Sequence, residues 1–191
     1  MTIALVGNGS SLKRLKKGAE IDAHDIVIRM NLFYKFLDPE ITGTKVDIWA
    51  CCFNWVGMYL EKPSIEIPSI WVTRPAHWDG SVSESANWRI PDWAKPRIKF
   101  ELGDEGYSIS EKMVRALGGK NPTTGFNALY IADKLFPSVG KDLYGFDFYE
   151  PNNYYYTEDA ITFPVKHHHS PEIEKILIMD GVKEGKYRWI N

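Results

Sequence analysis

Three consecutive histidines, His167, His168 and His169, are the residues of this chain best suited to move a proton near neutral pH. An imidazole can accept the proton of a hydroxyl group while that group attacks a substrate, because it changes charge near neutrality. Histidine triplets also occur on protein surfaces and in tags, where they do no chemistry. The sequence therefore offers candidates for a general base without selecting one of them.

The beginning of the chain, residues 4–18, has the pattern of a phosphate-binding strand, turn and helix. Gly7 and Gly9 have the G-x-G spacing of a dinucleotide-binding turn, but Leu12 stands where that fingerprint has its third glycine. The next strand ends in the neutral Asn31 rather than in an acid that would bind a ribose. The pattern is therefore a poor match to an NAD site.

A nucleotide with a single phosphate fits the same turn better. Asn8, the backbone N–H groups of the turn around Ser10, and Asn31 can hydrogen-bond a phosphate and sugar hydroxyls. A tight turn that binds no ligand is the alternative interpretation.

Two further polar stretches stand where an α/β fold exposes groups to ligands. Thr123, Thr124 and Gly125 open an expected helix, and a helix N-terminus favours anions. Simple helix capping would require the same residues. Asp147 and Tyr149 lie at the end of an expected strand, at the edge where open α/β sheets bind ligands.

The elements that would position these residues alternate along the chain. Strands are expected at 2–7, 25–31, 47–53, 69–74, 97–102 and 142–149. Helices are expected at 10–17 (ended by Gly18), 110–117, 123–135 and 169–182. This alternation predicts an α/β fold: a single Rossmann-like domain over residues 1–191, with a central, mostly parallel sheet covered on both faces. Residues 75–96 lack periodicity and predict a long loop or lid.

The composition narrows the classes of partner. The chain has 191 residues and a formal net charge of −2, so it lacks the basic field that nucleic-acid binding needs. Its two cysteines, Cys51 and Cys52, are adjacent, and neighbouring cysteines rarely bridge each other. No apolar run approaches the roughly 20 residues that cross a bilayer, and no signal peptide is recognisable. We therefore expect a cytoplasmic protein without a membrane span.

Three motifs, in this order, resemble those of the eukaryotic-type sialyltransferases, glycosyltransferase family 29. VGNGSSL, followed by IDAHDIVIRMN and GTKVDIW, resembles the large sialylmotif. NPTTGFNALYIADKLFPSVGKDLYGFDFY resembles the small sialylmotif. His169, with Glu174 five residues on, resembles the very small motif, H-x4-E.

The resemblance implies a GT-A-like variant of the Rossmann fold and an inverting, metal-independent reaction. The enzyme would move a 2-keto sugar acid from its CMP donor, CMP-sialic acid or CMP-Kdo, to a hydroxyl of a glycan or oligosaccharide acceptor. No cofactor beyond the CMP-activated sugar is implied. The chain contains no D-x-D pair, the usual carboxylate clamp for a metal-bound nucleotide diphosphate, which is consistent with metal independence.

Carried onto this chain, the resemblance selects His169 as the general base and leaves His168 as the second candidate. It implies that Asn8 and Asn31 contact the phosphate and ribose of CMP, and that the turn at 123–125 contacts the phosphate and carboxylate of the donor. The predicted donor-binding set is Gly7, Asn8, Gly9, Ser10, Asn31, Thr123, Thr124, Gly125, Asp147 and Tyr149.

Between its small and very small motifs, the family has a His or Tyr that assists departure of the phosphate. Here the interval holds Tyr154, Tyr155 and Tyr156 and no histidine in the same stretch, which favours stabilisation of the phosphate by a hydroxyl. An aromatic packing patch is the alternative, and the sequence does not choose among the three tyrosines.

The chain departs from the family at its structural disulfide. Ala4 and Asn127 stand near the positions of the two missing cysteines, which is consistent with a cytosolic enzyme. Trp78, Trp88 and Trp93 of the expected lid are candidates to stack on an acceptor sugar.

Two other hypotheses remain beside the transferase. One is a non-catalytic CMP- or nucleotide-binding protein of the same fold, and the other is a Rossmann oxidoreductase or methyltransferase. The joint presence of His169, Asn8, Asn31 and the turn at 123–125 favours the transferase. The sequence leaves three questions open: whether the sugar is sialic acid or Kdo, which acceptor is used, and what the oligomeric state is.

Overall fold

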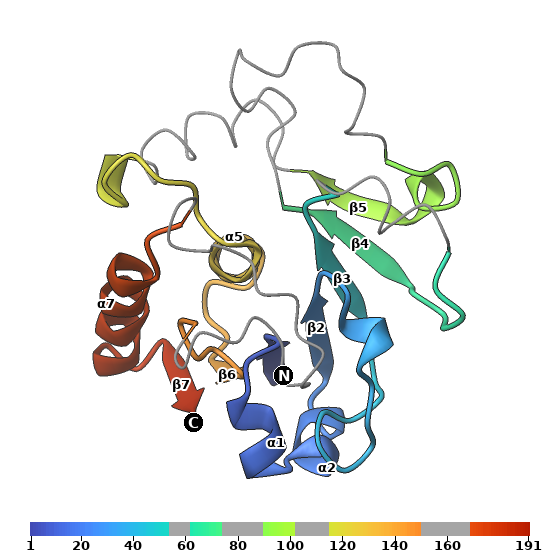
Figure 1. Cartoon of the computed structure of the whole chain (residues 1–191), viewed down its shortest axis with the longest axis horizontal. Coiled ribbons are helices and arrows are strands. Elements are labelled where there is room, and N and C mark those ends of the chain that lie inside the picture. The colour runs from blue at the N-terminus through green and yellow to red at the C-terminus, as the bar shows by residue number, and fades with distance from the viewer. Residues whose placement is uncertain (54–61, 74–89, 102–114, 150–168) are drawn as a thin grey trace.

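A computed structural model of the chain describes residues 1–53, 62–73, 90–101, 115–149 and 169–191. The described strands are β1 (Ile3–Val6), β2 (Ile26–Met30), β3 (Ile48–Cys51), β4 (Ser69–Val72), β5 (Ile98–Glu101), β6 (Lys141–Tyr144) and β7 (Tyr187–Ile190). The described helices are α1 (Ser11–Leu15), α2 (Gly18–Asp22), α5 (Thr124–Leu135) and α7 (Pro171–Lys183), with 3-10 turns at Phe33–Lys35 and Lys95–Arg97. All seven strands join one parallel sheet, which confirms the predicted α/β architecture (Figure 1).

Helices cover both faces of this sheet. Alternate side chains of a strand point to opposite faces, so Ile3 and Leu5 of β1 pack in the cluster that contains residues of α5 and α7. Ala4 and Val6 pack instead with residues of α1 and α2. In Figure 1, α5 lies between α7 and the strands β2 to β5, while α1 and α2 lie at the bottom of the view. Burial on both faces explains why β1 is a continuous apolar run.

The order of the strands, β5-β4-β3-β2-β1-β6-β7, creates a switch point beside β1. From β1 the chain adds four strands outward on one side, and then returns through α5 to place β6 on the other side of β1. The loops that leave β1 and β6 therefore diverge at the carboxyl edge of the sheet. Open α/β sheets bind their ligands in the crevice that forms there.

The start of the chain differs from the prediction at Gly18. This glycine was expected to end the first helix, but α1 ends at Leu15, Lys16 adopts a positive φ of 50°, and Gly18 begins α2. A Cβ at position 18 would lie 1.9 Å from the carbonyl oxygen of Pro39. The glycine therefore permits a close approach between α2 and the loop after β2, and does not act as a helix stop.

The end of the chain holds a strand that was not predicted. β7 pairs in parallel with β6, and β6 is shorter than the expected 142–149 because Gly145, with a φ of 66°, turns the chain out of the sheet. β7 was missed because four residues, two of them polar or charged at an edge of the sheet, carry little periodicity.

Parts of the other predictions fall outside the described residues. The expected helix at 110–117 lies there for most of its length, as do Trp78 and Trp88. Trp93 is described, and its ring stacks on that of the buried Trp49, with centroids 5.8 Å apart and planes 6° from parallel. Trp93 therefore packs against the core of the protein.

The charged residues of the IDAHDIVIRMN segment support the fold. Arg29 is 1% exposed, donates hydrogen bonds to the backbone carbonyls of Lys45 and Thr42, and lies 3.5 Å from Asp22. These bonds hold the loop between β2 and β3 against the sheet.

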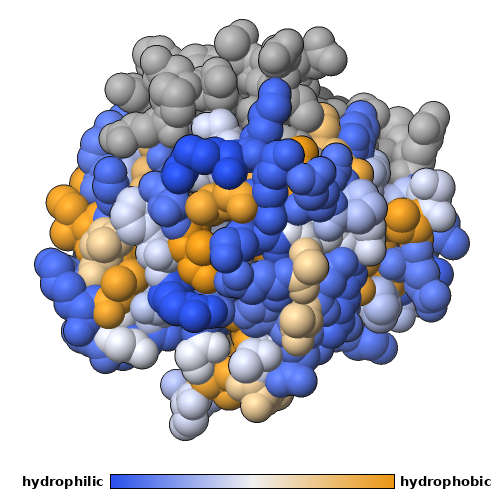
Figure 2. Space-filling view, turned by 90° about the horizontal axis from the view of Figure 1, so that it is seen from below, coloured by the Kyte–Doolittle hydropathy of each residue, from blue (hydrophilic) through white to orange (hydrophobic). Residues whose placement is uncertain are grey.

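The side of the molecule seen from below is mainly hydrophilic (Figure 2). Its hydrophobic residues form small patches rather than one broad surface. Over the described residues, the large hydrophobic side chains that are exposed are Met1, Leu135, Ile176 and Leu177. A few exposed hydrophobic residues are common on protein surfaces and indicate no docking surface by themselves. No helix in the described part of the chain is long and apolar enough to cross a membrane.

Candidate functional site

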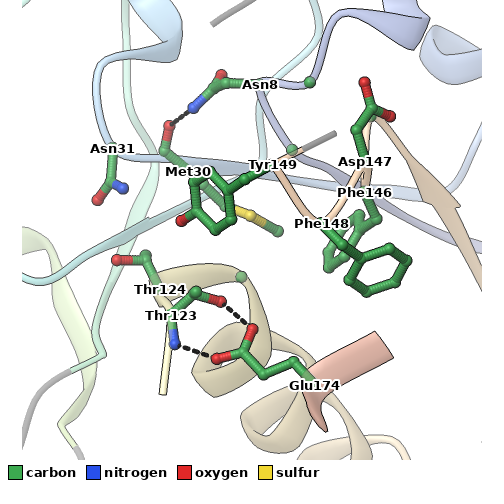
Figure 3. A pocket seen from close by; sticks show the side chains of 14 residues that line it. Asn8, Met30, Asn31, Thr123, Thr124, Phe146, Asp147, Phe148, Tyr149 and Glu174 are labelled. Carbon is green, nitrogen blue, oxygen red and sulfur yellow. Dashed lines mark hydrogen bonds between the residues drawn. The ribbon is translucent and has the colours of Figure 1, made fainter. Parts of the chain in front are cut away.

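A cleft opens at the carboxyl edge of the sheet, at the switch point beside β1 (Figure 3). Its empty space is about 620 Å³ when the open solvent at its mouth is included. The loops after β1, β2 and β6, the N-terminus of α5, and α7 all contribute to its wall. Nine of the ten predicted donor-binding residues line it: Gly7, Asn8, Gly9, Asn31, Thr123, Thr124, Gly125, Asp147 and Tyr149.

The tenth residue, Ser10, faces a separate cavity on the α1 side of Asp147. It stands at the N-cap position of α1, but its side chain makes no capping bond. Asp147 supplies the cap from across the sheet: Oδ2 accepts from the backbone N–H of Ser11 at 2.7 Å, and both Ser10 and Ser11 hydroxyls donate to this carboxylate. In a dinucleotide-binding fold the pyrophosphate occupies this helix N-terminus. The carboxylate of Asp147 holds that place here, which disfavours the dinucleotide hypothesis on geometry.

Gly7 and Gly9 let the loops after β1 and β6 touch. A Cβ on Gly7 would lie 2.5 Å from the carbonyl oxygen of Gly145, and one on Gly9 would lie 2.5 Å from Cγ of Asp147. The N–H of Gly9 donates to the Gly145 carbonyl at 3.0 Å. The G-x-G spacing is therefore needed for packing between the loops, whatever ligand the cleft takes.

We expect Gly9→Ala to destabilise the protein by about 1–3 kcal/mol, because the new methyl group must displace the Asp147 side chain or the backbone at Gly145. The free energy of unfolding, measured in urea, tests this. Gly140→Ala is the matched control, because a Cβ there meets nothing within 4 Å. Equal stability of the two variants would contradict the packing role of Gly9.

The two asparagines stand at the ends of neighbouring strands. Asn8 donates from Nδ2 to the carbonyl oxygen of Met30 at 3.1 Å, and so ties the loop after β1 to the end of β2 (Figure 3). Asn31 has a positive φ of 50°, and its backbone carbonyl accepts from the indole of Trp49 at 2.7 Å. Its Nδ2 makes no hydrogen bond to any residue that the structure describes. The amide of Asn31 therefore brings N–H donors to the cleft wall.

The N-terminus of α5 forms the opposite wall. Thr123 is its N-cap, and the Thr123 hydroxyl oxygen accepts from the N–H of Phe126 at 3.1 Å. The first amides of a helix have no intrahelical acceptor, and those of Thr124 and Gly125 belong to this turn. The turn carries no acidic residue of its own. It can therefore receive an anion, as predicted from the sequence.

Glu174 lies directly behind this turn. Its side chain is 3% exposed, Oε1 accepts from the backbone N–H of Thr123 at 2.7 Å, and Oε2 accepts from the Thr123 hydroxyl at 2.7 Å. Burial raises the pKa of Glu174 to about 7, against the opposing effect of these two hydrogen bonds. The second residue of the H-x4-E motif thus joins α7 to the N-terminus of α5.

His169 lies beside the cleft, in contact with a residue of its wall. Its Nδ1 is 2.8 Å from the carbonyl oxygen of Asn121, and its ring stacks on Tyr149 with centroids 6.5 Å apart and planes 3° from parallel. Because a carbonyl oxygen can only accept, Nδ1 carries the hydrogen and Nε2 carries the lone pair of the neutral ring. This is the tautomer in which Nε2 can accept a proton.

The loop after β6 presents Tyr149 through an uncommon backbone conformation. Phe148 and Tyr149 are consecutive non-glycine residues with positive φ angles of 51° and 62°. Each costs free energy that neighbouring contacts must offset. Phe148 supplies such contacts, because its ring packs on Trp189 at 5.8 Å and lies under Nζ of Lys175 at 5.7 Å.

Several predicted residues are not placed by these observations. His167, His168 and the three tyrosines at 154–156 lie outside the described residues. Cys51 and Cys52 are both free thiols.

Within the described ranges, no three His, Cys, Asp or Glu side chains gather in a way that could hold a metal ion.

Comparison with known proteins agrees with this arrangement. Two crystal structures of a mammalian sialyltransferase, one of them in complex with Gal-beta-1-3GalNAc-ortho-nitrophenol, superpose on the chain with TM-scores of 0.63 and 0.61. They are 21% and 22% identical to it, and the matches cover 99% of this chain and 68% of theirs. The chain therefore has the sialyltransferase fold, a GT-A-like variant of the Rossmann architecture.

Sequence comparison supports the same class. Residues 1–34, which span β1 to β2, match the family model of Glycosyltransferase family 29 (sialyltransferase). Type 2 lactosamine alpha-2,3-sialyltransferases of Mus musculus and Rattus norvegicus are 24% and 25% identical over 209 residues, which cover 94% of this chain. The chain spans 62% and 61% of the length of these two relatives. The predicted resemblance to the sialyltransferases of family 29 is confirmed.

Five residues that line the cleft are absent from the predicted donor-binding set: Met30, Gly145, Phe146, Phe148 and Glu174. Glu174 is the most informative of them. The motif named it, but a carboxylate five residues after a histidine gives no sign that it contacts Thr123, 51 positions earlier. The bidentate contact depends on the packing of α7 beside α5, which no local pattern encodes.

Proposed function

We propose that this chain is an inverting, metal-independent glycosyltransferase that moves a sialic acid from a CMP donor to a hydroxyl of a glycan acceptor. Kdo is the alternative sugar, because its CMP donor presents the same phosphate, carboxylate and 2-keto carbon. The observation that carries the proposal is the convergence of the α5 N-terminus and the amide of Asn31 on one cleft, with His169 stacked on Tyr149 of the cleft wall.

The chemistry assigned to this cleft follows from its donors and its base. The anionic groups of the donor would lie against the amides at Thr124 and Gly125, and the ribose or phosphate against Asn31. The acceptor oxygen attacks the anomeric carbon from the side opposite the leaving group and gives its proton to Nε2 of His169. The bond between the anomeric carbon and the phosphate oxygen breaks, and CMP leaves with the electron pair. A hydroxyl from the tyrosines at 154–156 is proposed to stabilise that phosphate.

Calorimetric titration of the purified protein with CMP, CDP and NAD, with and without EDTA, tests the donor assignment. We expect CMP to bind equally well with EDTA and NAD not to bind. Absence of CMP binding, or its loss with EDTA, would overturn the assignment.

Product assays with CMP-sialic acid and CMP-Kdo then test the reaction. Transfer to a glycan, or slow release of CMP to water, separates an enzyme from a protein that only binds CMP. Tight CMP binding with neither activity would favour the non-catalytic alternative. The cytoplasmic location expected from the sequence stays a prediction.

A further inference from the structure

The hydrogen bonds around Glu174 fix the direction of one hydroxyl in the cleft. An ionised carboxylate has no hydrogen to donate, so the hydrogen of the Thr123 hydroxyl must point at Oε2 of Glu174, 2.7 Å away (Figure 3). The same hydroxyl oxygen already accepts from the N–H of Phe126. Thr123 lines the cleft but, with Glu174 ionised, has no hydrogen left for a ligand.

The charges of the cleft make the ionised state unfavourable once an anion binds. Among the described residues that line it, two are acidic, Asp147 and Glu174, and none is Lys or Arg. The donor of the proposed function would add a phosphate and a carboxylate. A buried carboxylate behind the same helix N-terminus would repel both, because little water separates the charges.

The titratable groups near Glu174 that the structure describes do not form ion pairs with it. On its own element lie Glu172 and Lys175, and His169 comes before that helix. Lys120 precedes α5, and Asp147 stands on the loop after β6. Among the described residues, none of these groups forms an ion pair with Glu174, whose side chain has Thr123 as its hydrogen-bonding partner.

We propose that binding of the anionic donor is coupled to uptake of one proton by Glu174, and that this proton turns the Thr123 hydroxyl from Glu174 towards the donor. This inference rests on the proposed function and adds a binding group to it. After protonation, Oε2–H donates to the Thr123 oxygen and Oε1 still accepts from the Thr123 N–H. The Thr123 oxygen then accepts from Oε2–H and from Phe126, so its own hydrogen is released to the ligand. No heavy atom needs to move, and every hydrogen is accounted for.

Protonation is accessible near neutral pH. Burial already raises the pKa of Glu174 to about 7 in the empty cleft, so a nearby anion has only to raise this pKa further. The direction of the change in affinity with pH follows from this pKa. Above about pH 7 the empty protein must take up a proton in order to bind, and its apparent affinity falls by up to about tenfold per pH unit. Well below pH 7 the proton is already present, and affinity no longer depends on it.

The probe is the methyl phosphodiester of CMP, whose single phosphate charge does not titrate between pH 6 and pH 8.5. Calorimetry in two buffers with different heats of ionisation gives both the affinity and the number of protons taken up. For the unmodified chain we expect uptake to rise from near zero at pH 6 towards one at pH 8.5, while affinity falls. Binding without proton uptake at pH 8.5 would overturn the switch and leave the proposed function standing.

Glu174→Gln imitates the protonated state. The amide nitrogen can donate to the Thr123 hydroxyl oxygen while the amide oxygen accepts from the Thr123 N–H, so the hydroxyl points permanently at the ligand. We expect this variant to bind the probe without Glu174-linked proton uptake, and more tightly than the unmodified chain at pH 8.5. Glu172→Gln, on the exposed face of the same helix, is the matched control and should keep the pH dependence.

The outcomes separate the two proposals. A Glu174→Gln variant that keeps the pH dependence of the unmodified chain would assign the proton to another group and overturn the switch. If the unmodified chain and Glu172→Gln bind neither the probe nor CMP at any pH, the proposed function fails, and the switch fails with it. The number of protons that the unmodified chain takes up on binding is enough to decide the question. The test therefore still works if a variant does not fold.

Discussion

Replacing His169 by alanine is expected to lower the rate of sugar transfer by about 10² to 10⁴, the usual contribution of a positioned general base. The affinity for CMP should change little, because the proposed base acts on the acceptor hydroxyl and not on the CMP part of the donor. A fall in kcat without a matching change in CMP affinity is the signature of a group that acts on the attacking hydroxyl. Transfer assays and calorimetry on the same preparation measure both quantities.

Two variants make this test specific. His168→Ala removes the neighbouring histidine, which was the second candidate, and should retain transfer if His169 is the base. His169→Asn can keep a donor for the carbonyl of Asn121 but has no basic nitrogen, so it should be as inactive as the alanine variant. Activity within tenfold of normal in His169→Ala, with loss in His168→Ala, would move the base to His168.

The sequence predicted the sheet because its strands carry their own signal. A strand buried on both faces is mostly apolar, so residues 2–7 were recognisable without knowledge of their neighbours. Residues 25–31 were recognisable from their β-branched residues. The same holds for α5, whose apolar stripe and threonine cap are local features, and whose cap the structure confirms at Thr123. The convergence of the loops on a cleft then follows from parallel strands alone.

What the sequence did not predict depends on contacts between distant segments. Gly18 was expected to stop a helix, because a glycine after a basic helical run usually does so. In the structure, a glycine is needed there because the backbone of Pro39 lies too close for a Cβ atom. Asp147 was expected to face the donor, and its carboxylate also caps α1, 136 positions away from Ser11. These roles are properties of packed surfaces, so a pattern read along one segment does not contain them.

The free energy of unfolding should also depend on pH through Glu174. Its pKa is 4.5 in an exposed chain and about 7 in the folded protein. Because the folded state binds the proton more tightly, this group contributes stability that is fully present below about pH 4.5 and is lost as pH rises through 7. A shift of this size corresponds to about 3 kcal/mol, with burial of the carboxylate as its cause.

Glu174→Gln should therefore be more stable than the unmodified chain at pH 8.5, by up to about 3 kcal/mol, and the difference should shrink towards pH 5. The physical reason is that the variant keeps both contacts with Thr123 and never carries a buried negative charge. Urea unfolding at pH 5, 7 and 8.5 gives the comparison, with Glu172→Gln as the exposed control. If the two glutamine variants show the same pH dependence, the folded protein does not hold Glu174 as an uncompensated carboxylate.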